Sequence, residues 1–372
     1  MNSIKRTINP VILFFTLLVN HCFGQQDIQS SQFMINPFLL NPAYSSMDES
    51  LDTKVSHRNQ WIGVEGAPKT SYLSSHVPIG KPLWAQTHPG DFHNWHGAGF
   101  QVLNDKIGAY NNYRFNANYS YNLGLSQGDG YGYEHTDGFR IALGTFFGWN
   151  YYSVDGDILS KSKTSTGSRI DNDVVYTDET YNELVGIGSS LNFDMSFGAL
   201  LYYGNKYFLG VSSSQIFEND IKITSESKLN RHYFITGKYK HRVSEPLYII
   251  PSVIFKYVQN APLSYNLNVR VDWWDQLFAG LGYRSGDAIT LMAGAEVKWG
   301  EKIKNFRRDK HRYRMHIYYT YDYTTSKLNT KNLLGRSKGS HEITIAFLLP
   351  PFYIERNPED TWKWMPNQKH HH

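Results

Sequence analysis

The stretch YRFNANYSYNL, residues 113–123, decides the fold. Apolar or aromatic side chains, from Tyr113 to Leu123, alternate with polar ones, from Arg114 to Asn122. Because successive side chains of a strand point to opposite faces, one face of this strand suits lipid and the other suits water. A strand of a soluble sandwich would alternate too, but usually over fewer residues. Eleven unbroken residues match a tilted strand that crosses a bilayer, so the stretch predicts a membrane-spanning strand.

The same alternation recurs along the chain, most clearly at 265–272, 289–298 and 313–322. It predicts an all-β fold, a transmembrane antiparallel β-barrel of about 14 strands that occupies residues 51–348. Bacterial single-chain barrels have an even number of strands, as this prediction does. The predicted strands are 53–62, 70–78, 96–104, 112–123, 138–152, 190–203, 206–214, 231–240, 247–257, 265–272, 276–284, 288–298, 312–323 and 340–348.

The composition favours the same class of fold. Aromatic residues make up 15% of the chain, and the mean hydropathy is −0.47. After the N-terminal leader, no stretch approaches the 18 or more uncharged apolar residues of a transmembrane helix. In a membrane barrel only every second residue faces lipid, so no window becomes strongly apolar. The net charge of +4 is small for this length and gives no reason to expect a nucleic-acid partner.

Residues 1–24 predict a cleaved signal peptide. Lys5 and Arg6 supply a positive start, and the apolar core VILFFTLLV at 11–19 is too short to span a bilayer. The only cysteine, Cys22, raises the alternative of a lipoprotein, but the residues before it lack the small side chain that acylation requires. Cleavage would leave a mature chain with no cysteine, which excludes disulfides. We therefore expect export toward a Gram-negative outer membrane.

The run after the leader, residues 25–50, differs from every predicted strand. It contains Asn36-Pro37 and Asn41-Pro42, and proline removes a backbone donor and restricts the residue before it. We expect an extended, kinked segment whose apolar side chains dock elsewhere, either as a plug of the lumen or as a docking surface. The alternative is a disordered linker between leader and barrel. The C-terminal tail, residues 349–372, is expected on the periplasmic side.

The connections between the predicted strands suggest an orientation. If the N-terminus is periplasmic, the first, third and later odd connections lie outside the cell. The odd connections include the longest, 153–189, whereas the even ones include the short turn at Gly204-Asn205. Short periplasmic turns and longer outer loops are typical of these barrels.

Eight stretches, in order along the chain, carry a family resemblance. They are the N-terminal run 25–44, RNQWIGVEGAPKT (58–70), 193–217, RHY (231–233), 256–262, GYRSGDA (282–288), YDYTTSKL (321–328) and GSHEI (339–343). Together they resemble the PorP/SprF family of Bacteroidetes outer-membrane proteins, which is associated with type IX secretion and gliding motility. The chain departs from the family pattern in its long connection at 153–189 and in the tail past 349.

The resemblance implies a non-enzymatic outer-membrane barrel that serves type IX protein secretion. Its expected partners are outer-membrane lipid, a secreted surface protein of adhesin type or its C-terminal domain, and components of the secretion machinery. Candidate partner-binding residues are those of the resembling stretches. They are Phe33, Asn36, Pro37, Phe38, Leu39, Leu40, Asn41, Pro42, Arg58, Gln60, Trp61, Pro68, Arg284 and Asp287.

Two other functions stay open at this point. The first is a diffusion channel or a transporter of hydrophobic substrates, with the N-terminal run as a plug. The second is an outer-membrane hydrolase whose Ser and His lie on separate strands without a local motif. Conductance measurements would reveal the first alternative and a lipase assay the second.

Motifs for catalysis or metal binding are weak. His88, His93 and His96 lie within nine residues, but Pro89 and Gly90 indicate a loop without fixed ligand geometry. The acidic residues of the long connection lack the glycine and the terminal Glu of a calcium loop. No Gly-x-Ser-x-Gly motif is present in the sequence. We predict no catalytic residue, no cofactor and no metal.

Charged residues on the polar face of the predicted strands are interpreted as ion pairs inside the lumen. A charge at the depth of the membrane persists only where it faces the interior or is paired. A selective pore is the functional alternative. These residues are Arg114, Arg140, Asp194, Lys238, Lys256, Arg270, Asp272, Arg284, Glu296 and Arg314.

Overall fold

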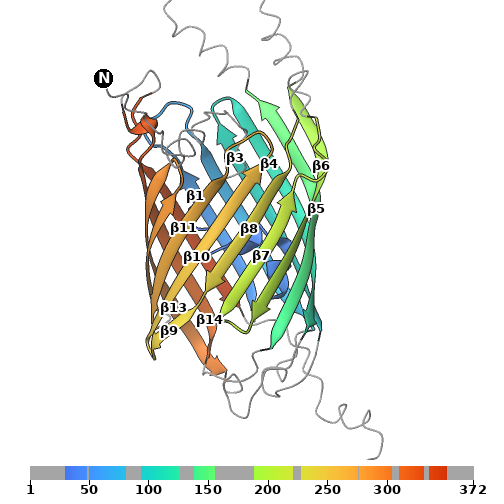
Figure 1. Ribbon diagram of the computed structural model, residues 1–372, viewed down its shortest axis with the longest axis vertical. Helices are drawn as coiled ribbons and strands as arrows, with labels where there is room; N and C mark the ends of the chain where they lie inside the picture. Colours follow the sequence, from blue (N-terminus) through green and yellow to red (C-terminus); the bar gives the residue numbers. More distant parts are fainter. Residues whose placement is uncertain are drawn as a thin grey trace, which may run out of the picture.

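The computed structural model describes residues 30–47, 50–80, 94–125, 138–155, 188–220, 228–274, 276–303, 310–330 and 335–349. These residues form one antiparallel sheet that closes on itself as a barrel (Figure 1). The predicted leader and nearly all of the predicted C-terminal tail lie outside the described residues, as do His88 and His93. Among the described helices, none is long and apolar enough to cross a membrane.

The sheet contains fifteen strand segments within the described part of the chain. They are β1 (Leu51–Asn59), β2 (Lys69–Ile79), β3 (Trp95–Ile107), β4 (Tyr110–Gly124), β5 (Phe139–Val154), β6 (Ser189–Tyr203), β7 (Tyr207–Ser214), β8 (His232–Tyr239), β9 (His241–Ser244), β10 (Leu247–Val258), β11 (Ser264–Trp273), β12 (Leu277–Arg284), β13 (Ala288–Ile303), β14 (Lys310–Thr324) and β15 (Ser340–Leu349).

Each strand pairs with the next along the chain, and the first pairs with the last. Nine residue pairs, from Leu51 opposite Leu349 to Asn59 opposite His341, join β1 to β15 and close the barrel. The segments β8 and β9 both pair with β10 and are separated only by Lys240. They are therefore two parts of one strand, and the barrel has fourteen strands. This confirms the predicted fold and strand number.

The apolar and polar residues that alternate in the sequence lie on opposite faces of the barrel wall. In β4, the Phe115 side chain is 46% exposed on the outside, whereas its neighbour Asn116 is 7% exposed and faces the lumen. Outward side chains along β10 to β13 are almost uniformly aliphatic or aromatic. Because both rows come from one period-2 pattern, each strand supplies one apolar face to lipid and one polar face to the interior.

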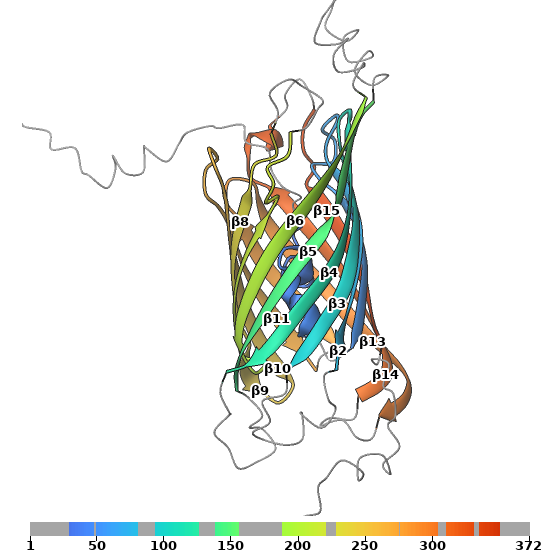
Figure 2. The ribbon, with the colours of Figure 1, turned by 90° about the vertical axis from the view of Figure 1, so that its right-hand side faces the viewer.

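The connections divide the barrel into two ends. The β1–β2 end carries the connections 60–68, 108–109 and 285–287 and the short 3₁₀ helix η4 (Lys327–Asn329); it is uppermost in Figure 1. The opposite end, which we call the β2–β3 end, carries the turn 204–206. Strand β1 begins at this end with Leu51, and β15 ends there with Leu349. Strands β5 and β6 are long and run obliquely along the wall up to the β1–β2 end (Figure 2).

Candidate functional site in the barrel lumen

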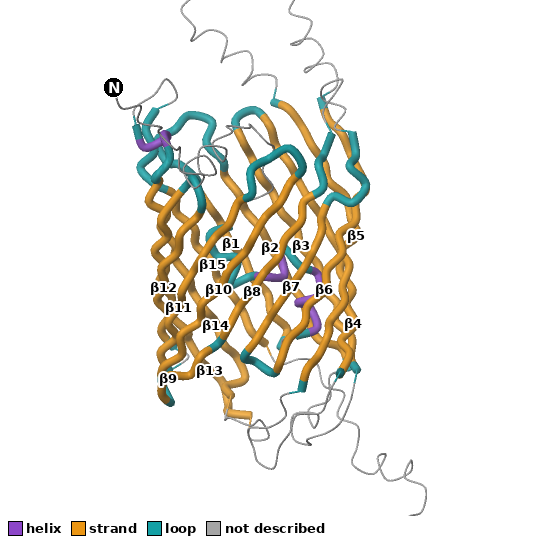
Figure 3. The backbone as a smooth tube through the Cα atoms, viewed as in Figure 1, coloured by secondary structure: helices purple, strands orange, loops and turns teal. Residues whose placement is uncertain are grey.

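The N-terminal segment, residues 30–46, lies inside the barrel (Figures 2 and 3). The structure adds two single turns of 3₁₀ helix to the expected kinked run: η1 (Pro37–Leu39) and η2 (Pro42–Ser46). Each Asn-Pro step starts one of them, with proline in the first turn, where a missing N–H costs nothing. The Asn41 side chain caps η2 by accepting a 3.0 Å hydrogen bond from the Ala43 N–H.

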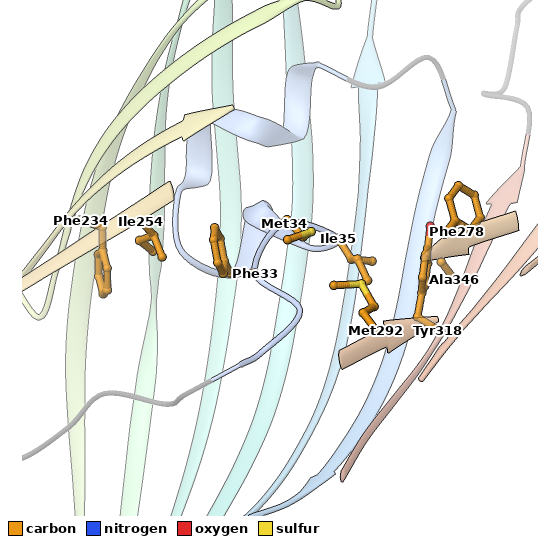
Figure 4. Close-up of a cluster of buried hydrophobic side chains, with 9 residues drawn as sticks. All are labelled: Phe33, Met34, Ile35, Phe234, Ile254, Phe278, Met292, Tyr318 and Ala346. Atoms are coloured by element: carbon orange, nitrogen blue, oxygen red, sulfur yellow. The ribbon is translucent and has the colours of Figure 1, made fainter. Parts of the chain in front are cut away.

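The first half of the segment packs on one side of the barrel wall. Phe33, Met34 and Ile35 are buried against inward-facing side chains of β8, β10 and β12 to β15 (Figure 4). These wall residues are Phe234, Ile254, Phe278, Met292, Tyr318 and Ala346. The barrel interior, which is otherwise polar, is therefore apolar at the positions that contact Phe33, Met34 and Ile35.

The second half of the segment packs on the wall made by β2 and β4 to β7. Phe38 has no exposed surface; its ring lies 4.5 Å from the ring of His76 and 5.0 Å from that of Phe146. Ala43 and Tyr44 join it in a second buried cluster. Burying one such side chain fully is worth about 1.5–3 kcal/mol, so the two clusters hold the segment firmly in the lumen.

Glycines in the wall make room for η2. A Cβ atom on Gly144 would lie 2.5 Å from the Pro42 carbonyl carbon, and one on Gly198 would overlap Asn41 Oδ1. A Cβ on Gly97 would lie 2.6 Å from the Ser46 nitrogen. Any larger residue at these lumen-facing positions would therefore displace the segment.

Polar side chains of the wall satisfy the backbone of the segment. Asn118 donates to the Pro42 carbonyl at 3.0 Å, Ser212 to the Leu40 carbonyl at 2.7 Å, and the Trp95 indole to the Ser46 carbonyl at 2.6 Å. The Asn41 side-chain amide donates hydrogen bonds to two wall carbonyls, those of Ala199 on β6 and Val211 on β7. Buried backbone groups outside regular structure need such partners, so wall and segment are built for each other.

A buried charge network fixes the other end of the segment. Arg58 on β1 lies 2.8 Å from Asp322 on β14 and 3.2 Å from Glu342 on β15. Arg284 on β12 lies 2.9 Å from Asp287 and 3.5 Å from Asp322. We call these five residues the Arg58 network.

Ser31 of the N-terminal segment occupies the centre of the Arg58 network. Its hydroxyl donates to Asp322 at 2.6 Å and accepts from the guanidinium groups of both Arg58 and Arg284, the latter at 2.6 Å. Its backbone N–H donates to Glu342 at 2.8 Å, and Ser30 donates to the same carboxylate. Charge-assisted hydrogen bonds of this kind are among the strongest in proteins, so the segment is anchored at this point.

The connection between β1 and β2 covers the network. Trp61 donates its indole N–H to Asp287 at 3.0 Å, and its backbone has a φ of +45°, which a bulky residue rarely adopts. Gln60 closes the base of this connection by a 2.9 Å hydrogen bond to the Pro68 carbonyl. The connection also pairs with residues of the β14–β15 connection through Val64 and Gly335.

The segment runs from one end of the barrel to the other. Ser30 and Ser31 contact Glu342, near the β1–β2 end, whereas Ser46 contacts Trp95, the first residue of β3, at the β2–β3 end. A small cavity of about 30 Å³ remains between the segment and the wall near Leu40 and Gln101. The segment therefore passes through the lumen between Glu342 and Trp95.

The structure brings the candidate residues together in two groups. Phe33 and Asn36 to Pro42 belong to the N-terminal segment in the lumen, and Arg58, Arg284 and Asp287 belong to the Arg58 network. Trp61 lies against this network and donates to Asp287. Gln60 and Pro68 lie beside that network. Sequence reasoning missed Ser31, Asp322 and Glu342; the last two stand at lumen-facing positions of the period-2 pattern, which was the available signal. The role of the candidate residues in binding a partner remains a prediction.

The interpretation of the charged strand positions as lumen ion pairs is confirmed for several residues. Arg270 lies 2.7 Å from Asp272, and Glu296 lies 2.9 Å from Lys298 and 3.7 Å from Arg314. His96 faces outward and lies 2.7 Å from the Tyr119 hydroxyl. Within the described ranges, no group of three His, Cys, Asp or Glu side chains is arranged to hold a metal ion.

These features define an integral membrane β-barrel whose lumen is occupied by its own N-terminal segment. The chain belongs to the family of type IX secretion system membrane proteins PorP/SprF, whose model matches residues 22–347. A search of curated proteins finds no match.

Solved structures of similar shape are outer-membrane barrels of low sequence identity. The CymD monoaromatic hydrocarbon channel is 9% identical, with 89% of this chain and 95% of that chain covered and a TM-score of 0.44. A Pseudomonas aeruginosa FadL homologue is 10% identical, with coverages of 83% and 92% and a TM-score of 0.41.

Proposed function

We propose that this protein is a non-enzymatic outer-membrane barrel that serves type IX secretion and gliding motility. It anchors or assembles with a secreted surface protein of adhesin type, through that protein's C-terminal domain, or with components of the secretion machinery. Membership of the PorP/SprF family supports this role.

The single observation that carries the proposal is the N-terminal segment held inside the lumen. A diffusion channel needs an open or easily opened path, whereas here the N-terminal segment is buried in two apolar clusters and joined to the Arg58 network. A barrel whose interior is tied to its own N-terminal segment is suited to present fixed surfaces to other proteins. The N-terminal segment would then support the docking surfaces at the barrel ends.

Deleting residues 27–44 tests this function. The expected result is a heat-modifiable barrel in the outer membrane that no longer supports secretion or display of its partner and no longer co-purifies with it from native membranes. The substitution Gly144→Ala, which would place a Cβ against Pro42, is expected to reduce the same readouts without removing any residue.

The alternative outcome is a channel. If the deletion opens a large single-channel conductance and leaves secretion and display unchanged, the segment is a plug and the assembly role is wrong. If a lipase assay detects activity in the purified protein, the non-enzymatic role is wrong.

A further inference from the structure

The outer wall at the β1–β2 end carries a ring of aromatic residues over most of the barrel. Tyr113 and Tyr151 pair across β4 and β5, with ring centroids 6.4 Å apart. Tyr233 pairs with Tyr257 across β8 and β10, and Tyr265 pairs with Tyr283 across β11 and β12. Aromatic side chains at this level mark the boundary between hydrocarbon and lipid headgroups.

Strands β1 to β3 interrupt this ring. In the row nearest the end, Lys69 stands opposite Asn59 on one side and Lys106 on the other. In the next row, Ser71 stands between His57 and Asn104, and the His57 ring nitrogen lies 2.8 Å from the Ser71 hydroxyl. We call these six outward residues the basic patch: Asn59, Lys69, Lys106, His57, Ser71 and Asn104.

The two lysines of the basic patch are placed unfavourably for an isolated protein. Lys69 and Lys106 are exposed cross-strand neighbours, and like charges directly opposite each other repel. Among the described residues, no carboxylate lies within ion-pair distance of either ammonium group. Arg336 and Lys338, exposed in the adjoining β14–β15 connection, add two positive charges at this end, and exposed Glu65 in the β1–β2 connection adds one negative charge. An anion between the lysines would remove the repulsion.

The position of the basic patch specifies the kind of anion. The row directly below it is apolar and faces outward: Val55, Leu73, Val102 and Phe115. A phosphorylated lipid places its acyl chains against such a row and its headgroup against the rows above. Lysine side chains on a membrane protein extend toward the interface and bind anionic headgroups there.

We propose that the basic patch binds the phosphorylated headgroup of a lipid A-type lipid of the outer leaflet. Lys69 and Lys106 hold a phosphate between them, and the His57–Ser71 pair and Asn104 supply further hydrogen-bonding groups. The inference uses the orientation in which the β1–β2 end, with the longest connection, faces outward. In this orientation Ser30 lies at the outer end of the lumen and not at the periplasmic end. The inference is independent of any secretion partner.

The test measures heat-modifiability of the full-length barrel purified in detergent, with added lipids as probes. Bisphosphorylated lipid A is expected to raise the temperature of half-conversion of the wild-type barrel, in proportion to its concentration, because it binds the folded state. Dephosphorylated lipid A is expected to cause no shift. The double variant Lys69→Gln/Lys106→Gln is expected to lose the shift.

A matched control removes the same charge at the other end of the barrel. Lys206→Gln/Lys240→Gln alters two lysines at the β2–β3 end, which are linked by a 2.8 Å backbone hydrogen bond, and is expected to keep the full shift. Without lipid, Lys69→Gln alone is expected to convert at the wild-type temperature or above it, because it relieves the repulsion. This separates loss of binding from loss of folding.

Four results would overturn the proposal. They are an equal shift with dephosphorylated lipid A, an equal shift with phosphatidylglycerol, a shift with inorganic phosphate alone, and a retained shift in the double variant. The second would assign the site to a lipid of the inner leaflet, and the third would assign it to a free ion. A normal secretion assay in the double variant is compatible with the proposal, because lipid binding and partner binding are separate surfaces.

Discussion

Arg58 Nη2 lies 2.8 Å from Asp322 Oδ2 and joins β1 to β14 across the intervening strand β15. The two residues are 3% and 1% exposed, so the pair is buried at the seam where the chain closes on itself. Because Ser31 bonds to both groups, one cluster connects the seam, the N-terminal segment and, through Arg284, strand β12. Closing the barrel and filling it are therefore structurally coupled.

The first prediction concerns this pair. Asp322→Asn removes the one carboxylate that contacts both Arg58 and Arg284, and leaves each guanidinium with a single carboxylate, Glu342 and Asp287 respectively. Removing one partner of a buried ion pair costs up to about 3–5 kcal/mol. We expect a large decrease in the free energy of unfolding, measured by urea titration of the refolded barrel. Glu245→Gln, which removes the partner of Arg242 in an exposed pair, is the control and is expected to cost less than about 1 kcal/mol. Equal effects of the two substitutions would show that the Arg58 network does not stabilise the barrel.

The second prediction tests the fit of the segment to the wall. Gly144→Ala places a Cβ 2.5 Å from the backbone of Pro42, and overpacking of this kind costs about 1–3 kcal/mol. In a chain that lacks residues 27–44 the same substitution is expected to cost nothing, since its neighbour is gone. The readout is the double-mutant cycle of unfolding free energies.

Gly148→Ala is the control for this cycle, on the same strand. Its Cβ would overlap the Phe115 carbonyl oxygen, which belongs to the wall itself. The cost is therefore expected in both backgrounds. A Gly144→Ala cost that persists after the deletion would contradict the placement of η2 against β5.

The barrel could be predicted from the sequence because its determinant is local. The period-2 pattern of a strand such as β4 is written in consecutive residues, and the order of the strands follows from antiparallel neighbours. The interruption at Lys240, which splits β8 from β9, was not predicted, since one residue leaves no pattern.

The candidate site could be predicted only in part, because its contacts are far apart in the sequence. Asn36-Pro37 and Asn41-Pro42 indicated a segment that docks elsewhere, and apolar residues such as Phe38 indicated burial. The Arg58–Asp322 pair spans 264 positions, so only the closed barrel brings the two together. A carboxylate on the polar face of a strand gives no information about which cation it will meet.

The third prediction concerns the outer face. Phe115→Arg places a cation against lipid, which costs about 2–4 kcal/mol at mid-membrane, whereas Phe115→Leu is expected to assemble normally. Heat-modifiability of the membrane fraction is the measurement. On the lumen side, Asn116 is only 7% exposed, so the lumen has little room for a larger side chain at this position. Asn116→Arg is therefore expected to impair assembly as well. Normal assembly of Phe115→Arg would show that this face does not contact lipid.

The last prediction concerns orientation. The connection 259–263 lies at the β1–β2 end, and the turn 204–206 lies at the β2–β3 end. Asn260 and Asn205 are both exposed, so each can accept a short protease site without disturbing a strand. If the β1–β2 end faces outward, protease added to intact cells is expected to cut the site after Asn260 and to leave the site after Asn205 intact until the outer membrane is permeabilised. The reverse pattern would invert the barrel, move the basic patch to the periplasmic leaflet and place Ser30 at the periplasmic end of the lumen.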